Sequence, residues 1–301
     1  AWVFNNQGVR NIYLANAPDF TARKVTNYDK DDGQEITALQ FTPDNSRIIF
    51  IRGGAANRAG ESPNPMSIQP SVEQAIWIMN DDGSELKKLA NGSYPKLSPD
   101  GKSMAYLNAG QIWLINIDSA GTGRKLFHAR GFQNNMRWSP DGDKLVFVSS
   151  RNDHAFIGLY EFSSNAIQFL DPSIDRDSNP VWSPDGKQIA FTRTPNVRNR
   201  LPFMPEREGH PWSIRIADIS SGKTKDLWVA KPGKGSVLYS GIPVVDNLLW
   251  WIGDRLIFPW ERDGWQHLYS VSVNGGDAMQ LTQGEGEVES VTVTRDGKGF
   301  L

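Results

Sequence analysis

A short turn of the form Ser/Thr-Pro-Asp-Gly/Asn recurs along the chain, and each copy is followed by an apolar, strand-like run. The clearest copy is Ser183-Pro184-Asp185-Gly186, which leads into the alternating run 188–192. Proline presets φ at the second turn position, Asp bonds its own backbone, and Gly accepts a positive φ. Alternation of apolar and polar residues is typical of a half-buried strand. Each copy therefore predicts a hairpin, and the recurrence predicts a repeat fold.

The spacing of these turns identifies the kind of repeat. Counting two degenerate copies, the turn aspartates are Asp44, Asp100, Asp141, Asp185, Asp254 and Asp296, separated by 56, 41, 44, 69 and 42 residues. A base period of about 42 residues with two insertions matches one four-stranded propeller blade. Within a unit, a second apolar strand such as 111–115 and a short outer strand such as 278–282 follow. We therefore expect an all-β fold, a β-propeller of four-stranded antiparallel blades.

Composition excludes several classes of protein. Apolar residues make up 39% and charged residues 22%, which is an ordinary globular balance rather than a disordered one. A formal net charge of -2 argues against a nucleic-acid partner, because such proteins usually carry a clear basic excess. No apolar run has transmembrane length, so we expect no membrane span. The absence of Cys excludes disulfides, a thiol nucleophile and Cys-ligated zinc.

The ends of the chain bear on its domain organisation. The first residue is Ala1 rather than Met, and the last residues stop at Leu301, where a strand should begin. We interpret residues 1–301 as a single propeller domain belonging to a longer protein. Six or more blades are expected. The strand-like remnant 1–27 either completes the blade that begins near Val293, giving six, or both ends continue, giving seven or eight.

Catalytic and metal-binding signatures are missing from the sequence. Gly-x-Ser-x-Gly does not occur, and Ser240 before Gly241 lacks the first glycine. The histidines, His128, His154, His210 and His267, show no metal-ligand spacing. We therefore expect no catalytic residue, no metal site and no cofactor in this chain. The four tryptophans of the late unit, Trp250, Trp251, Trp260 and Trp265, are expected to pack in the core rather than to line a pore.

Two insertions break the period, and long insertions in a compact repeat are often functional. The first covers roughly 53–71 and is rich in Gly and Pro, which indicates a long loop. The second covers 195–211 and contains Glu206 and Glu208, which would share one side of an extended strand. Together these two carboxylates would hold a cationic group such as the α-ammonium of a peptide. The alternative is that they pair with neighbouring arginines in a solvated loop.

Two runs in the late unit resemble a more specific group of proteins than the blade repeat does. The run Phe258-Pro259-Trp260-Glu261-Arg262-Asp263-Gly264-Trp265-Gln266-His267-Leu268-Tyr269, followed by Leu281-Thr282-Gln283-Gly284-Glu285-Gly286-Glu287-Val288, resembles the dipeptidyl peptidase IV branch of the prolyl oligopeptidase family of serine peptidases. That similarity covers about 179–291. The generic blade repeat, which also resembles the TolB type of periplasmic propeller, covers nearly the whole chain.

The resemblance implies an N-terminal propeller that gates access to a C-terminal α/β-hydrolase domain of the same polypeptide and helps to seat a peptide substrate. It also implies that the Ser-Asp-His triad lies in that second domain, and that the protein is periplasmic or secreted. Aminodipeptidases of the family bind the substrate's free N-terminus with a Glu-Glu pair. Here the surrounding Asp-Trp-x-Tyr-Glu-Glu pattern is missing, so Glu206 and Glu208 match it only loosely, and other exopeptidase or oligopeptidase activities stay open. A homodimer also stays open as a partner. The alternative is a TolB-like interaction propeller with no catalytic domain.

Overall fold

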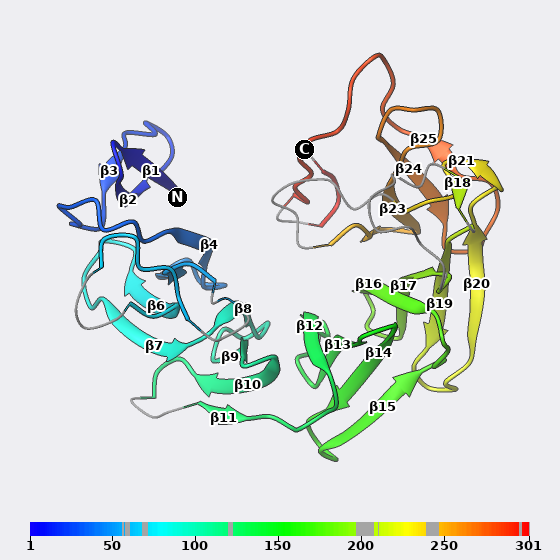
Figure 1. The fold of residues 1–301 in the computed structure, drawn as a ribbon, viewed down its shortest axis with the longest axis horizontal. Helices are drawn as coiled ribbons and strands as arrows, with labels where there is room; N and C mark the ends of the chain where they lie inside the picture. Colours follow the sequence, from blue (N-terminus) through cyan, green and yellow to red (C-terminus); the bar gives the residue numbers. More distant parts are fainter. Residues whose placement is uncertain are drawn as a thin grey trace. The chain divides into compact units, whose positions relative to one another are not determined.

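The computed structural model describes residues 1–55, 57, 61–67, 72–119, 123–196, 208–209, 211–238, 247–294 and 297–300. The described residues form β-strands, turns and bends and contain no helix (Figure 1). The chain divides into two compact units, Ala1–His128 and Ala129–Leu301. Among the described residues, no helix is long and apolar enough to cross a membrane.

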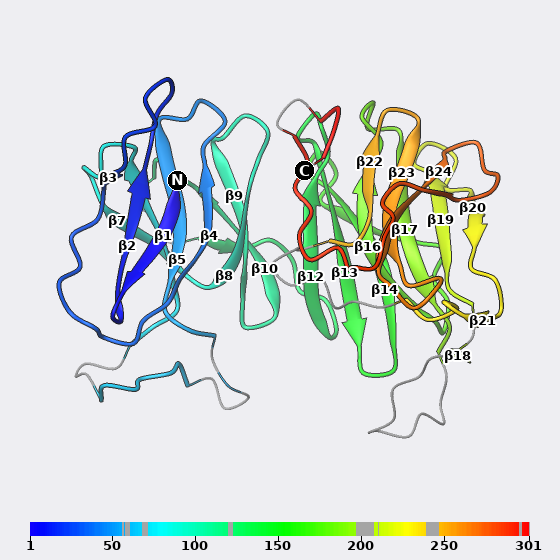
Figure 2. The ribbon, with the colours of Figure 1, turned by 90° about the horizontal axis from the view of Figure 1, so that it is seen from above.

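The first unit contains three antiparallel sheets, coloured from blue to cyan-green in Figure 2. The first sheet has three strands, β1 (Trp2–Asn6), β2 (Val9–Leu14) and β3 (Arg23–Lys24). The second has four, β4 (Ile36–Phe41), β5 (Arg47–Arg52), β6 (Ala75–Asn80) and β7 (Lys87–Asn91). The third also has four, β8 (Ser93–Leu97), β9 (Ser103–Asn108), β10 (Gln111–Asn116) and β11 (Arg124–Lys125).

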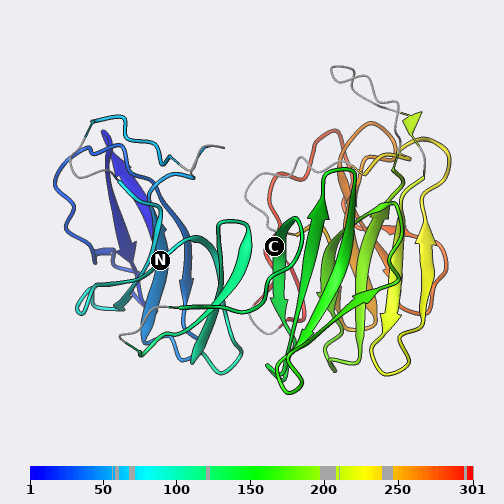
Figure 3. The ribbon, with the colours of Figure 1, turned by 60° about the horizontal axis from the view of Figure 1, so that its bottom comes forward.

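The second unit contains three more four-stranded antiparallel groups (Figure 3). They are β12 (Phe132–Trp138), β13 (Lys144–Arg151), β14 (His154–Glu161) and β15 (Ala166–Leu170); β16 (Arg176–Trp182), β17 (Gln188–Thr194), β19 (Ser213–Asp218) and β20 (Thr224–Val229); and β22 (Trp250–Ile252), β23 (Arg255–Trp260), β24 (His267–Ser272) and β25 (Met279–Gln280). A parallel bridge between Ala155 and Arg176 joins the first two groups. A two-stranded ribbon, β18 (Glu208–Gly209) with β21 (Gly233–Lys234), and a bridge between Val293 and Phe300 complete the unit. The predicted all-β fold of four-stranded antiparallel blades is confirmed.

The recurrent turn is held by one repeated hydrogen-bond network. Ser183 Oγ donates to Asp185 Oδ1 at 2.6 Å and accepts from the Gln188 amide at 2.9 Å. The Gly186 amide donates to the Ser183 carbonyl, and Gly186 has φ +70°. The same side-chain contact occurs at Thr42, Ser98 and Ser139. The motif therefore closes the hairpin between the first two strands of four blades, and its residues are structural.

A second repeated feature was not predicted. The first strand of four blades carries a β-bulge against the second strand. The bulged residues are Ala38, Tyr94, Asn135 and Asn179, with φ between +48° and +55°, and each lies six positions before its turn aspartate. A left-handed residue at a bulge bends the strand and increases its twist. Of the residue types found at the four bulges, only Asn adopts the left-handed conformation readily, so these residues do not reveal the bulges in the sequence.

The hydrophobic cores lie between consecutive sheets. In the first unit one cluster joins the sheets of β5 and β9 through Ile49, Ile76 and Met104. In the second unit another joins those of β14 and β17 through Ile157 and Phe191. The second strands of the blades, such as β5, β9 and β13, are buried on both faces and are therefore nearly continuous apolar runs. Whether residues 1–301 form a single domain, and how many blades the complete protein has, stay predictions.

Candidate functional site

Of the two predicted site residues, Glu206 and Glu208, only Glu208 lies within the described residues. Glu206 lies outside the described residues. Glu208 begins the short strand β18, whose backbone pairs with β21 so that Glu208 is opposite Lys234 and Gly209 is opposite Gly233. The end of the second insertion is therefore tied by backbone hydrogen bonds to a segment that follows β20. The proposed role of the pair in binding a substrate ammonium stays a prediction.

The ribbon formed by β18 and β21 rests on the run that carries the family resemblance. Trp260 Nε1 donates to the carbonyl oxygen of Gly235 at 2.5 Å. Gly235 has φ +79°, and a Cβ there would come within 2.9 Å of Trp260 Nε1 and of the Glu261 carbonyl oxygen. Only glycine therefore fits the left-handed conformation and the close approach. The structure thus brings together the second insertion and the 258–269 run, which the sequence separates by about fifty residues.

An aromatic cluster supports this contact from inside the unit. Trp212, Trp228 and Phe258 lie with ring centroids 5.0 to 5.6 Å apart. Trp260 packs edge to face against Trp228 at 4.9 Å and against Tyr269 at 5.0 Å. Edge-to-face pairs of this kind add to the stabilisation from burial. Trp260 is buried as predicted, whereas the same prediction is wrong for Trp265, which is 43% exposed because it lies in the turn between β23 and β24.

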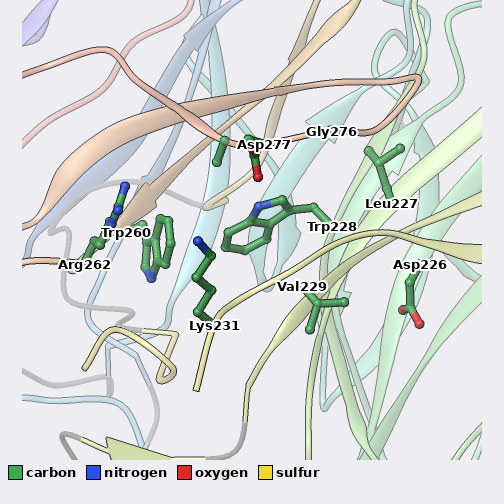
Figure 4. Close-up of a pocket in the computed structure, with 10 residues that line it drawn as sticks. Asp226, Leu227, Trp228, Val229, Lys231, Trp260, Arg262, Gly276 and Asp277 are labelled. Carbon is green, nitrogen blue, oxygen red and sulfur yellow. The ribbon is translucent and has the colours of Figure 1, made fainter. Parts of the chain in front are cut away.

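Next to the ribbon lies a cavity of about 520 Å³ between the sheets of β20 and β23 (Figure 4). Trp228 and Trp260 line it together with Lys231 from the segment after β20 and Arg262 from the turn after β23. Arg262 also lies over the Trp260 ring, 5.7 Å from its centroid. Asp277 and Ala278 close the side formed by the segment that precedes β25. A cavity of this size can hold a small organic group.

A buried ionic network lies where β17 leads into the second insertion. Asp177, whose side chain is fully buried, accepts from Arg193 Nε at 2.7 Å and from Nη2 at 2.9 Å. Arg193 also donates to Asp171, which in turn pairs with Arg215 at 2.9 Å. Burial raises the pKa of Asp177 to about 6, against the opposing effect of Arg193, so the carboxylate is ionised at neutral pH. Sequence reasoning missed this network because its members meet only through strand pairing.

The two insertions occupy equivalent places in their blades. The first joins β5 to β6, and the second joins β17 to β19, the second and third strands of each blade. A paired arginine lies at or next to the end of the strand before each insertion, Arg52 with Asp32 and Arg193 with Asp177. In two of the blades without an insertion, the matching connections are the two-residue turns 109–110 and 152–153, and between β23 and β24 the connection is 261–266. The equivalent position thus accepts segments of very different length.

Three of the four histidines lie in the part of the chain that the structure describes. His267 is buried, and its Nδ1 lies 3.2 Å from Thr282 Oγ1, which also accepts from the Leu268 amide. His154 Nδ1 lies 2.7 Å from the neighbouring Asp153. His210 lies outside the described residues. Within the described ranges, no group of three or more His, Asp and Glu side chains is arranged to hold a metal ion.

Comparisons with known proteins agree with this architecture. Residues 66–226 match the TolB beta propeller domain family, and residues 213–299 match the N-terminal region of dipeptidyl peptidase IV. The second match includes β21, Gly235 and Trp260, so the ribbon that holds Glu208 is built against the peptidase-like part of the chain.

Solved structures show the same fold at low sequence identity. TolB from Acinetobacter baumannii is 19% identical, with a TM-score of 0.51 over 95% of this chain and 63% of its own. Dipeptidyl peptidase 4 from Porphyromonas gingivalis is 14% identical, with a TM-score of 0.63 over 96% of this chain and 46% of its own. A puromycin-hydrolyzing peptidase from Mycobacterium tuberculosis is also 14% identical, with a TM-score of 0.63 over 92% of this chain and 42% of its own.

The chain therefore spans between about two fifths and two thirds of the length of these structures. As the resemblance predicted, it is a β-propeller domain related both to TolB and to the N-terminal domains of these peptidases. The chain belongs to the TolB β-propeller domain family, and its residues 213–299 are similar to the N-terminal region of dipeptidyl peptidase IV.

Proposed function

We propose that this chain is the substrate-gating and peptide-positioning propeller of a prolyl oligopeptidase-family serine peptidase. The observation that carries the proposal is the attachment of the second insertion to the peptidase-like run. The β18–β21 ribbon is fixed by backbone pairing, and the Trp260 Nε1 hydrogen bond holds the carbonyl of Gly235 beside it. A segment held in this way can present polar groups at a constant place, which substrate positioning requires.

Within this proposal, Glu206 and Glu208 bind the α-ammonium of a peptide. Two carboxylates on one side of an extended segment would give charge-assisted hydrogen bonds to an ammonium. The reaction itself takes place in a C-terminal α/β-hydrolase domain of the same polypeptide, so the isolated chain hydrolyses nothing. The resemblance to TolB-type propellers and to peptidases supports a periplasmic or secreted location. A homodimer is compatible with this function and is not required by it.

The test uses the full-length polypeptide and matched substrates with a free or an acetylated N-terminus. Glu206→Gln and Glu208→Gln should raise KM for the free peptide about tenfold or more, because an ammonium loses a charged partner, and should leave the acetylated peptide unchanged. Glu289→Gln, which changes an exposed carboxylate outside the insertion, is the control. Equal kinetics of the variants and the wild type with the free peptide would remove the insertion from the site.

The second candidate function is a TolB-like interaction propeller, favoured by the match over residues 66–226. It predicts a stoichiometric protein partner and no catalytic domain. Labelling of the full-length product by a fluorophosphonate, which reacts with activated serines, would decide against this candidate. Failure to label, together with recovery of one partner at equal stoichiometry, would decide for it.

A further inference from the structure

The cavity beside the ribbon holds two cationic groups that are poorly neutralised (Figure 4). Lys231 extends toward Trp228 and Trp260, and no carboxylate of the described residues lies within ion-pair distance of its ammonium. Arg262 has one ion pair, with its neighbour Asp263, at the limiting distance of 4.0 Å. Both groups belong to exposed segments at the edge of the cavity.

The carboxylates that line the cavity do not balance these cations. Asp226 is engaged by Arg215, whose Nη1 donates to Asp226 Oδ1 at 2.5 Å. Asp277 is then the one lining carboxylate of the described residues that is not engaged in an ion pair. Two cations therefore face a single uncommitted anion across a cavity of about 520 Å³. Such a surface attracts an anionic group.

The remaining wall is apolar. Leu227, Val229 and Ala278 line the cavity beside the edges of the two indole rings. Val229 is 49% exposed although it belongs to a strand, so part of this wall is open to solvent. An apolar body attached to an anion would cover this area while the anion stayed near the cations. Ligand sites typically combine an apolar wall with a few polar groups that fix orientation.

The first unit contains a cavity at the equivalent place, and comparison of the two cavities shows which features come from the repeat and which come from the charged residues. The cavity of the first unit lies between β7 and the sheet of β9 and β10, with a volume of about 610 Å³. Lys87, Lys88 and Trp113 are among its lining residues, but Lys88 is tied to Glu73 in an ion pair. Both cavities therefore arise from the spacing of the outer strands in the repeat. In the first unit Lys125 lies over the Trp113 ring at 5.8 Å, whereas in the second unit the cation over the indole, Arg262, itself lines the cavity together with Lys231.

We propose that the cavity of the second unit binds a small carboxylate joined to an apolar or aromatic group, such as an acylated amino acid. Lys231 Nζ and Arg262 pair with the carboxylate, and the apolar group covers Val229 and the edges of Trp228 and Trp260 that line the cavity. This site is separate from Glu206 and Glu208, which are proposed to bind an ammonium. The proposal does not depend on whether the protein is a peptidase.

The probe is hippurate, which is N-benzoylglycine, and its neutral amide is the matched control ligand. Both are titrated to about 20 mM against the ¹⁵N-labelled chain, and the indole N–H resonances of the 11 tryptophans are followed. Trp228→Phe assigns the reporter signal. Hippurate should give a saturable shift of that signal, and the amide should bind at least about fivefold more weakly, the factor expected for one exposed ion pair.

Variants locate the site. Lys231→Gln and Arg262→Gln should each weaken hippurate binding about fivefold, while Lys87→Gln in the cavity of the first unit should leave it unchanged. Unchanged dispersion of the other indole signals shows that the variants are folded. Three results would each overturn the proposal: equal shifts with hippurate and its amide, unchanged binding by Lys231→Gln, or an equal loss in Lys87→Gln.

Discussion

Breaking the buried pair of Asp177 and Arg193 should destabilise the second unit strongly. In Asp177→Ala the guanidinium of Arg193 loses its two hydrogen bonds to Asp177, at 2.7 and 2.9 Å, and keeps its hydrogen bonds to Asp171. Removal of one member of a buried pair typically costs 3 to 5 kcal/mol. Because the remaining carboxylate of Asp171 still accepts, we expect a loss of about 3 kcal/mol in the free energy of unfolding.

Removing both charges distinguishes pairing from packing. In Asp177→Ala/Arg193→Met no unpaired buried charge remains at this position, so the double variant should be more stable than the sum of the single losses predicts. A coupling energy of about 2 kcal/mol is expected for two groups in direct contact. The assay is urea unfolding followed by tryptophan fluorescence and, independently, by circular dichroism.

The exposed ion pair of Lys187 and Asp185 serves as the control for the buried pair. Lys187→Met breaks the contact of Lys187 with Asp185, whose groups lie 3.8 Å apart with side chains 79% and 58% exposed. This change should alter stability by less than about 0.5 kcal/mol. If the Asp177→Ala loss were also below about 1 kcal/mol, or if the two changes added, the network would not be holding the loop and the strand together.

Three further outcomes follow from the structure. Ser183→Ala should cost about 1 to 2 kcal/mol in urea unfolding, because the Gln188 amide loses its acceptor, whereas Ser183→Thr should largely restore it, as Thr42 does in its own turn. Gly235→Ala should weaken the protection of the β21 amides in hydrogen exchange, while leaving that of β13 unchanged. Hydrogen bonds from Thr42 and Ser46 lower the pKa of Asp44 to about 2, so its contribution is present above the unfolded pKa of about 4 and is lost as the pH falls toward 2. Acid unfolding of Asp44→Asn should lack this dependence, and an unchanged acid profile would contradict it.

The pKa of Asp177 gives a dependence of the opposite sign. Since burial raises that pKa to about 6, the folded state binds more protons than the unfolded state between pH 4 and 6. The stability of the wild type relative to Asp177→Ala should therefore increase as the pH falls through this range. Paired urea titrations at pH 7 and pH 4.5 measure the change, and a smaller difference at pH 4.5 would show that Asp177 is not raised in pKa.

The turns could be predicted from the sequence because their geometry is local. Ser183, Asp185 and Gln188 lie within six residues, so residue type and spacing determine the hydrogen bonds. The bulges could not be predicted, since Ala38 and Tyr94 give no sign of a left-handed backbone. Turn rules depend on residues that are adjacent in the sequence, whereas a bulge depends on the pairing of its strand with a neighbouring strand.

The candidate site was predictable only in outline. The spacing between turns located the second insertion, but not its pairing with β21 or the contact of Gly235 with Trp260. Those contacts join segments that the repeat brings together in space. The same holds for Arg193, whose partners lie 16 and 22 residues away. Burial of Trp265 was predicted wrongly, because the clustering of tryptophans along the chain does not show which of them lies in a turn.

The position shared by the two insertions makes the blade a natural acceptor for grafted segments. Both replace a connection between the second and third strands, and the strands on either side keep a regular antiparallel register. The two-residue turns 109–110 and 152–153 occupy the same place in their blades. A recognition loop inserted there would leave the strand pairing unaltered, because the extra residues leave and return at one sheet end. Binding specificity in such a scaffold can therefore be exchanged one blade at a time.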